Sequence, residues 1–352
     1  MDPISLVDVA SYLPENRVPT EWFTQFARSD RMAKNVMFRA PKFRHHVATD
    51  ETAVDMAERA LAPLIERNGA DAVLGVDILL THTQLPDLPV IGCGVDLAKR
   101  MGMNPEWILD VHNGGCASFV YMTKLAQTIM STTSATSALV VAVQNVAGQG
   151  MTQTEVRKLA QAPVPGDGCG VGLLRKSEEA PVLGTVCRNY PEFAGDMTGE
   201  VDPPRKYWEA GPGQWRVSFN EAKVVKVFAR GNRLVPEVAT AVCDQIGVHS
   251  RDVDLLVTNQ PNRLFLRNWR EALELPPEKH FDTFDECGNL FGAGIPVNLD
   301  MANRAGRIPN GALVLMSAFA HAGDFAGAAA VRWGAAASAQ RSEAIQHGSE
   351  PT

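Results

Sequence analysis

Apolar residues recur along this chain with two periods, and segments of the two kinds alternate. Short segments rich in apolar residues predict strands at residues 6–12, 77–81 and 138–143, because such segments are typical of sheet interiors. A spacing of three and four residues predicts an amphipathic helix at 51–67 and another helix near 92–100. Strands that alternate with helices are typical of the α/β class.

The stretch around Cys116 combines a strand, a tight turn and a helix. Residues 108–111 are apolar apart from Asp110, 112–115 include two adjacent glycines, and a helical spacing of apolar residues begins at Cys116. Unpaired N–H groups and the positive dipole at a helix start favour the thiolate, which is the nucleophilic form of cysteine. Gly115 lets the chain turn sharply and lets a substrate carbonyl approach. We therefore interpret Cys116 as a nucleophile; the alternative is a buried structural cysteine, which we expect for the other five.

The sequence also contains an internal repeat. Four segments return in the same order later in the chain: DILLTH at 77–82 as DLLVTN at 254–259, LDVHNGGC at 109–116 as FDTFDECGN at 281–289, ALVVAV at 138–143 as ALVLMS at 312–317, and GDGCGVGLLR at 166–175 as GDFAGAAAVR at 323–332. The shared order predicts a duplicated α/β unit. Cys116 and Asn289 lie at equivalent turns, so a pseudo-twofold axis would bring them to one crevice.

The repeat suggests a division of the chain into four parts. We expect an N-terminal half at 1–176 with the nucleophilic cysteine and a C-terminal half at 225–334. The segment 177–224 between them is rich in Pro, Gly and aromatic residues, which is typical of a lid or binding segment. The tail at 335–352 loses its apolar period, and we expect it to be disordered.

The composition limits the function. The chain has 352 residues and a net charge of −7, which argues against a general nucleic-acid binder because phosphate contact needs a basic face. Because we find neither a signal peptide nor an apolar segment of membrane-spanning length, we expect a cytoplasmic protein without membrane contact. Six cysteines without a C-x-x-C pair predict neither a metal site nor disulfide bonds.

The duplicated halves, the strand and turn before Cys116, the Gly-Asp-Gly at 166–168 and the Gly-Asn at 288–289 resemble the ketosynthase III branch of the thiolase superfamily. The resemblance implies a thiolase-like α/β fold of five layers, αβαβα, in a homodimer. It also implies acyl transfer through an acyl-cysteine. The donor would be a thioester of coenzyme A or of an acyl carrier protein, without a tightly bound cofactor.

Two catalytic positions of that family match this chain, and a third does not. Cys116 falls on the family's nucleophile and Asn289 on its active-site asparagine. The family's histidine opens a His-Gln-Ala-Asn motif, where this chain has Asn259 in NQPN. In the family, the histidine and asparagine stabilise the enolate formed when a malonyl thioester loses carbon dioxide. The missing histidine puts decarboxylative condensation in doubt, and we expect Asn259 to contact substrate instead.

His321 is the candidate that replaces this histidine. Acyl transfer to a hydroxyl needs a thiolate, an oxyanion site and a general base. AFAHAGDFAG at 318–327 occupies the place of a Gly-rich loop that, in the family, approaches the cysteine and donates a backbone N–H to the oxyanion hole. We expect His321 to be the base, and the backbone at Ala322 and Gly323 to contact substrate. A loop histidine bonded to backbone is the alternative.

Asp324 stands three residues after His321 and could orient its imidazole. The repeat offers a second interpretation, because Asp324 is the counterpart of Asp167. An aspartate at both turns is also explained by a role in holding the turn.

A row of arginines follows the NQPN turn. Arg263, Arg267 and Arg270 share one face if this segment is helical. In an acidic protein, such a row could dock an acidic carrier protein or a coenzyme A phosphate. A solvated basic face is the alternative.

We therefore expect an acyltransferase that resembles the ester-forming ketosynthase III homologues of antibiotic pathways. An acyl group, with malonyl and its retained carboxylate as one option, would pass through acyl-Cys116 to an acceptor hydroxyl, for example on a glycoside. The alternatives are a condensing enzyme of the 3-oxoacyl synthase III type, an acyl shuttle between carriers, and an inactive ketosynthase-like partner subunit. The Cys116 turn argues against the last.

Overall fold

Two five-stranded sheets form the centre of the molecule, and the computed structural model describes residues 3–27, 32–88, 91–206 and 208–334. The strands of the first sheet, in spatial order, are β1 (Ile4–Tyr12), β7 (Gly168–Lys176), β6 (Ser137–Gln144), β4 (Ile78–Thr83) and β5 (Trp107–Asp110). Those of the second sheet are β8 (Val182–Asn189), β14 (Phe325–Arg332), β13 (Leu313–Ala320), β11 (Leu255–Thr258) and β12 (His280–Phe281).

The two sheets have the same topology. In the first, β4 runs parallel to β5 and β6, while β7 is antiparallel to β6 and β1. In the second, β11 runs parallel to β12 and β13, while β14 is antiparallel to β13 and β8. The four repeated sequence segments contribute equivalent strands, so the predicted duplication is confirmed. The sequence missed a fifth pair, β1 and β8.

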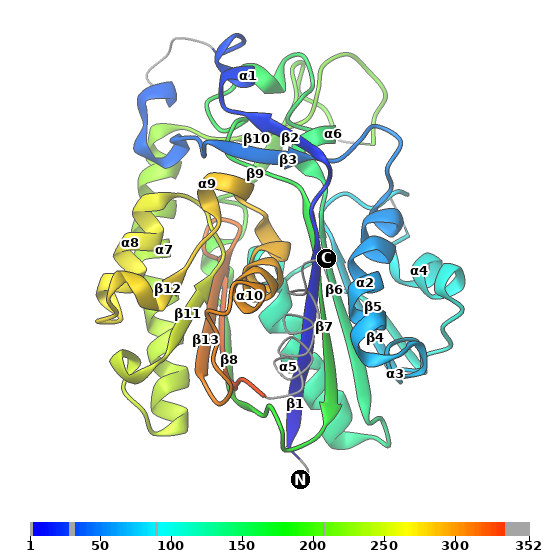
Figure 1. Cartoon of the computed structure of the whole chain (residues 1–352). Helices are drawn as coiled ribbons and strands as arrows, with labels where there is room; N and C mark the ends of the chain where they lie inside the picture. The colour runs from blue at the N-terminus through cyan, green and yellow to red at the C-terminus, as the bar shows by residue number, and fades with distance from the viewer. Residues whose placement is uncertain (1–2, 28–31, 89–90, 207, 335–352) are drawn as a thin grey trace, which may run out of the picture.

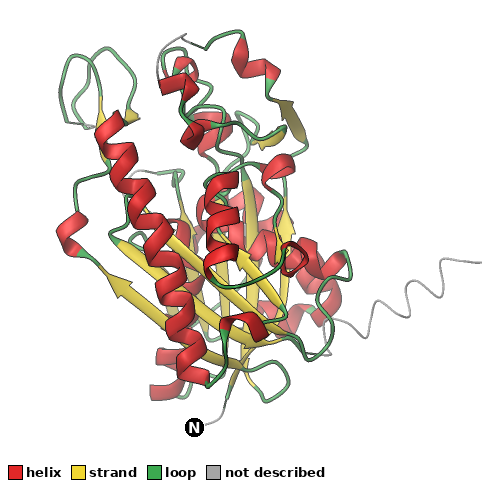
Figure 2. Ribbon diagram, turned by 90° about the vertical axis from the view of Figure 1, so that its left-hand side faces the viewer, coloured by secondary structure: helices red, strands yellow, loops and turns green. Residues whose placement is uncertain are grey.

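Helices cover both sheets and separate them (Figure 1). Outside the first sheet lie α2 (Ala53–Asn68), α3 (Ala70–Leu74) and α4 (Gly94–Met101). Between the sheets lie α5 (Ser118–Thr132) and α10 (Gly294–Arg304). Outside the second sheet lie α7 (Glu221–Ile246) and α8 (Arg263–Ala272). The long α7 crosses in front of the strands in Figure 2. The predicted five-layered αβαβα fold is confirmed.

Three apolar cores correspond to these layers. The central core packs α5 and α10 between the sheets, for example through Phe119 and Leu299. The second core packs α7 and α8 on the second sheet, with Trp269 fully buried. The third packs α2 and α4 on the first sheet. Each outer helix therefore buries one apolar face, as the helical spacing of its residues predicts.

Shorter elements surround the ends of the sheets. The small helices are α1 (Glu21–Thr24), α6 (Val146–Gln149) and α9 (Phe284–Cys287). Two hairpins join β2 (Asn16–Pro19) to β3 (Phe43–His46), and β9 (Thr198–Glu200) to β10 (Arg216–Ser218). Two 3₁₀ turns lead directly into the two central helices: η3 (Gly115–Ala117) precedes α5, and η8 (Phe291–Ala293) precedes α10.

The predicted boundaries differ from the structure in three places. Strand β8 belongs to the second sheet, so the second half begins at Val182 and the insert is shorter than 177–224. Helix α5 begins at Ser118, so Cys116 lies in η3 just before it. The predicted tail at 335–352 lies outside the described residues.

Within the described ranges, every helix is too short or too polar to cross a membrane. All six cysteines are free thiols.

Candidate active site

A cavity of about 180 Å³ opens where equivalent turns of the two halves meet. Cys116 reaches it from the first half, and Asn289 and His321 reach it from the second. The prediction that the Cys116 and Asn289 turns are neighbours is confirmed by this shared lining. The polar lining residues are Gln84, Cys116, Gln161, Asn259, Asn289 and His321, and the rest of the wall is mainly Met, Val, Pro and Phe.

Gly115 brings the nucleophile turn close to His321. Its φ is +46°, in the left-handed region that glycine enters without steric cost. A Cβ on Gly115 would lie 3.0 Å from His321 Nε2 and 3.0 Å from the Cβ of Ala320. Any larger residue at 115 would push the imidazole away, so the glycine sets the distance between the Cys116 turn and His321.

Burial makes the Cys116 thiol a weak acid. Desolvation raises the pKa of the thiol to about 12, and the Cys116 backbone and the Asn259 side chain oppose this only in part. The Asp324 carboxylate raises it further. Desolvation therefore opposes the thiolate that the helix start favours. Cys116 needs a neighbouring base to become a nucleophile.

His321 is held with one ring nitrogen on a carboxylate. Its Nδ1 lies 2.8 Å from Asp324 Oδ1, and its Nε2 faces Gly115 beside Cys116. The residue sits in the turn between β13 and β14 with a φ of +49°. A non-glycine residue in that region costs roughly 1–2 kcal/mol. Backbone strain of this kind persists only where the surrounding structure holds the residue in place, and it is common at active sites.

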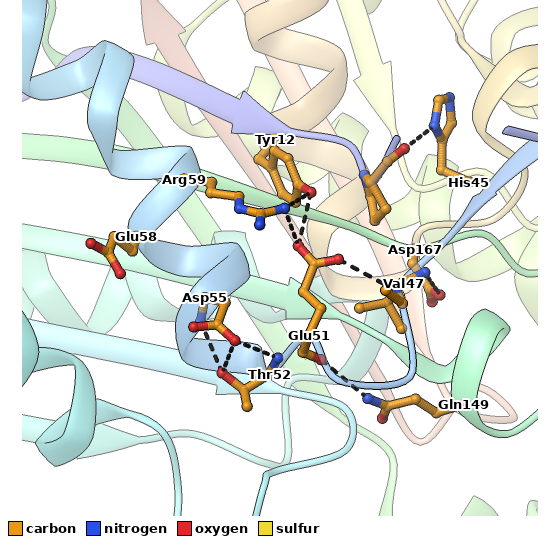
Figure 3. A network of polar contacts seen from close by, with 12 residues as sticks. Tyr12, His45, Val47, Glu51, Thr52, Asp55, Glu58, Arg59, Gln149 and Asp167 are labelled. Carbon is orange, nitrogen blue, oxygen red and sulfur yellow. Dashed lines mark hydrogen bonds and ion pairs between the residues drawn. The ribbon is translucent and has the colours of Figure 1, made fainter. Parts of the chain in front are cut away.

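Asp324 and its counterpart Asp167 make different contacts. Asp167 is fully buried and accepts backbone N–H bonds from Val47, Ala147 and Gly148 at 2.8, 2.7 and 2.6 Å. Figure 3 shows the bond to Val47. Burial raises the pKa of Asp167 to about 7, although the three donors oppose this. Asp167 holds its turn, whereas the Asp324 carboxylate bonds the imidazole.

Two asparagine amides face the same cavity. Asn289 Oδ1 accepts the Phe291 N–H at 3.0 Å, which fixes the amide and leaves its NH₂ free to donate. Asn259 is 1 % exposed, and apart from its interaction with the Cys116 thiol neither its Oδ1 nor its Nδ2 has a hydrogen-bond partner in the described part of the chain. A buried amide with unused hydrogen-bonding capacity is costly, and its NH₂ group can donate to a substrate carbonyl.

Five predicted residues do not line the cavity: Ala322, Gly323, Asp324, Arg263 and Arg267. Gly323 N–H bonds Ala320 O at 2.9 Å, and Ala322 O accepts a bond from Arg230 at 3.2 Å. Ala322 and Gly323 therefore hold the turn, and the substrate contacts predicted for them stay predictions.

Arg263 and Arg267 also do not line the cavity. Arg263 pairs with Asp285, and Arg267 lies 3.8 Å from Glu271. Both sit on the outer face of α8, and their neighbours Pro261 and Phe265 supply the cavity wall instead. The predicted arginine row exists, but carboxylates partly neutralise it.

Sequence reasoning missed several lining residues. Gln84 follows strand β4, Gln161 precedes the Gly-Asp-Gly turn, and Phe291 has an unusual φ of +44°. No short motif marks such positions, because the fold alone brings them together. The segment predicted to be a lid contributes Met197 and Phe219 to the cavity wall.

Two other candidate histidines are placed elsewhere. His82 is buried with Nδ1 2.8 Å from Val111 O, and His112 is exposed. Within the ranges that the structure describes, no group of three or more His, Cys, Asp or Glu side chains could hold a metal ion.

Two family models match the chain. The model described as 3-oxoacyl-[acyl-carrier-protein (ACP)] synthase III matches residues 109–191, and its C-terminal companion matches 243–333. A protein of Alkalilimnicola ehrlichii named beta-ketoacyl-[acyl-carrier-protein] synthase III is 31% identical over 284 residues, which cover 78% of this chain and 83% of that protein. One of the same name from Xanthomonas oryzae is 28% identical over 338 residues, with 94% and 96% covered.

Solved structures agree with these matches. The 3-oxoacyl-(acyl carrier protein) synthase III of Pseudomonas aeruginosa has a TM-score of 0.79 at 23% identity, with 94% of this chain and 98% of that chain covered. The beta-ketoacyl-[acyl carrier protein] synthase III of Thermus thermophilus has a TM-score of 0.78 at 25% identity, with 94% and 99% covered.

Proposed function

The chain belongs to the beta-ketoacyl-[acyl-carrier-protein] synthase III family, and from this premise we propose that it transfers an acyl group from a thioester, through Cys116, to an acceptor hydroxyl. One observation carries the proposal. An imidazole bonded to Asp324 faces the Cys116 turn, while Asn259 stands where the resemblance places the family's histidine.

In the first half-reaction, His321 Nε2 takes the proton of the Cys116 thiol. The sulfur attacks the thioester carbonyl, the bond to the donor sulfur breaks, and the donor thiol leaves with that proton. The NH₂ groups of Asn289 and Asn259 stabilise the negative charge that develops on the carbonyl oxygen. Asp324 stabilises the imidazolium.

In the second half-reaction, the neutral His321 removes the proton of an acceptor hydroxyl. The oxygen attacks the acyl-Cys116 carbonyl, the carbon–sulfur bond breaks, and the proton passes to the sulfur. This step uses a base but no enolate, so it does not need a histidine at position 259. In this respect the chain resembles the ester-forming malonyltransferase of cervimycin biosynthesis. A glycoside hydroxyl is the acceptor that we propose.

Condensation is the second candidate, and the names of the curated relatives favour it. In that reaction the acyl-Cys116 would be attacked by the enolate of a malonyl thioester after loss of carbon dioxide. The neutral Asn259 amide stabilises an enolate less than a histidine would, which is why we place hydroxyl transfer first. An acyl shuttle and an inactive partner subunit remain outcomes of the test.

The test loads the enzyme with butyryl-CoA and divides the sample. One portion receives methyl β-glucoside and a second malonyl-CoA, with Cys116→Ala as the control. We expect a butyryl adduct on Cys116, a butyryl ester of the glucoside and no release of carbon dioxide. Release of carbon dioxide with a 3-oxohexanoyl product would support condensation. A third portion receives an acyl carrier protein with a free pantetheine thiol, and an adduct that only this portion loses would indicate a shuttle. Absence of any adduct would indicate an inactive subunit.

The donor and the assembly are part of the same proposal. The thioester is carried by coenzyme A or an acyl carrier protein, which share a pantetheine arm, and no tightly bound cofactor takes part.

We propose that a second copy of the chain pairs along β5, which is the outer strand of the first sheet. Leu109 on β5 is 36% exposed, and Leu85 and Ile91 nearby are 38% and 52% exposed.

A further inference from the structure

The turn that carries His321 depends on neighbouring segments for its shape. His321 has a φ of +49° and Gly323 a φ of +103°, and Gly323 N–H bonds Ala320 O across the turn at 2.9 Å. The strained backbone at His321 keeps this conformation only where other parts of the chain hold it. The place of the imidazole beside Cys116 therefore depends on the contacts behind the turn.

Arg230 of helix α7 packs against the back of this turn. A Cβ on Gly323 would lie 3.1 Å from both Cβ and Cδ of Arg230, so the glycine lets the arginine stem lie directly against the backbone. Arg230 Nη1 donates to Ala322 O at 3.2 Å. Ala322 is 1 % exposed, and a buried carbonyl needs a donor of this kind. Arg230 therefore holds the turn at the residue that follows His321.

The guanidinium of Arg230 also contacts the segment 190–197, which is part of the predicted lid. Its Nη1 lies 2.6 Å from Asp196 Oδ2, and its central carbon lies 3.8 Å from the centre of the Phe193 ring. The hydrogen bond from Arg230 lowers the pKa of Asp196. The Arg230 side chain is only 14 % exposed, and solvent ions screen a partly buried pair less than an exposed one. The ion pair and the cation–π contact together attach this segment to α7.

The segment 190–197 also contacts the turn directly. Tyr190 N–H bonds the backbone oxygen of Asp324 at 2.7 Å, and Asp324 is the residue whose carboxylate bonds His321 Nδ1. At its other end, the segment reaches Met197, which lines the cavity. The segment is thus attached to the turn at two places, through the arginine and through Tyr190, and runs from there to the cavity wall.

We propose that Arg230 is a positioning residue for the base. It ties the segment 190–197 to the His321 turn and so keeps the imidazole beside Cys116. Arg230 is not among the described residues that line the cavity, so it acts through His321 rather than on the substrate. Without the arginine, Ala322 O loses its donor and the strained turn relaxes away from Cys116. This inference rests on the proposed acyl transfer through Cys116.

A double-mutant cycle tests whether Arg230 acts through His321. Loading of Cys116 from butyryl-CoA is followed by intact mass in the natural chain, in Arg230→Ala, in His321→Ala and in the variant with both changes. We expect Arg230→Ala to slow loading at least tenfold in the natural chain but less than twofold in the His321→Ala background, where the base is already absent. The final amount of adduct should stay the same, because every molecule remains folded.

Two further variants complete the experiment. Arg230→Lys keeps a positive charge beside Asp196 but lacks the planar guanidinium, so it should recover part of the lost rate. Arg233→Ala is the matched control, because Arg233 is an exposed arginine of the same helix. Its loading rate should stay within twofold of that of the natural chain.

Each result decides one point. Loading of Arg230→Ala at the natural rate would overturn the role of Arg230 and leave the proposed acyl transfer standing. Equal slowing in both backgrounds, or a smaller final amount of adduct, would also overturn it, because Arg230 would then only support the fold. The same slowing in Arg233→Ala would overturn it as well, since charge lost from α7 would be the cause. Absence of an adduct in the natural chain would overturn the proposed function itself.

Discussion

The conformation of His321 links its chemistry to a cost in stability. Its left-handed backbone favours glycine, so the imidazole is present although another residue would fit the turn better. Ordinarily alanine is more stable than glycine by roughly 0.5–1 kcal/mol inside regular structure. At position 321 this order should reverse.

We predict that His321→Gly is more stable than His321→Ala by about 0.5–1 kcal/mol, because alanine retains the strain of the positive φ. Both variants should lose hydroxyl transfer by at least about 100-fold, since both lack the base. Urea denaturation gives the first quantity and ester formation the second. Greater stability of the alanine variant would refute the strain argument.

The raised pKa of Cys116 predicts how alkylation depends on pH. With a pKa near 12, the thiolate fraction rises about tenfold for each pH unit up to that value. Iodoacetamide labelling of Cys116 in the free enzyme, followed by peptide mass mapping, should therefore rise between about pH 7 and pH 10 without reaching a plateau. A plateau near pH 8 would mean that the helix start lowers the pKa after all.

At the residue scale, the identity of the candidate catalytic residues could be predicted from the sequence better than the surroundings of their side chains. Cys116, Asn289 and His321 could be found because each stands in a short pattern, and all three reach one cavity. The surroundings of these side chains could not be predicted, since the desolvation of Cys116 and the burial of the Asn259 amide beside it depend on residues distant in sequence.

At the scale of elements, the equivalent turns before β7 and β14 have similar sequences, but their aspartates make different hydrogen bonds. Asp167 accepts three backbone bonds, whereas Asp324 bonds one imidazole. The same substitution at the two positions should therefore have different consequences.

Asp167→Asn should destabilise the protein by about 1–3 kcal/mol, because the new NH₂ group meets a buried backbone donor. Asp324→Asn should change stability by less than about 0.5 kcal/mol but reduce transfer at least tenfold, since the amide no longer stabilises an imidazolium. Thermal unfolding and ester formation measure the two effects. A large loss of stability in the Asp324 variant would mean that Asp324 mainly holds the turn.

The repeat made most of the sheet order predictable, because each repeated segment became the same strand in its own half. Strand β8 was missed because only two of its eight residues are fully buried, so its apolar pattern is weak. The start of α5 was misplaced by two residues, since the 3₁₀ turn at Gly115–Ala117 continues the helical spacing.

At the scale of the whole molecule, the proposed dimer uses β5, which is an edge strand of the first sheet. Unpaired edge strands are sites where a second chain can add. We predict that Leu109→Lys weakens dimer formation at least tenfold, or about 1.4 kcal/mol, because the two copies of the new charge would face each other. Sedimentation velocity over a concentration series measures this. A natural chain that stays monomeric would refute the proposed dimer.

The whole account depends on His321 serving both half-reactions beside Cys116. The most direct measurement uses His321→Ala incubated with butyryl-CoA until Cys116 is loaded, because even slow reaction of the thiol without its base accumulates the adduct. After removal of excess donor, methyl β-glucoside is added and the Cys116 adduct is followed by intact mass. We predict an adduct that decays at least about 100-fold more slowly than in the natural chain. Equal decay in the two proteins would contradict the central claim.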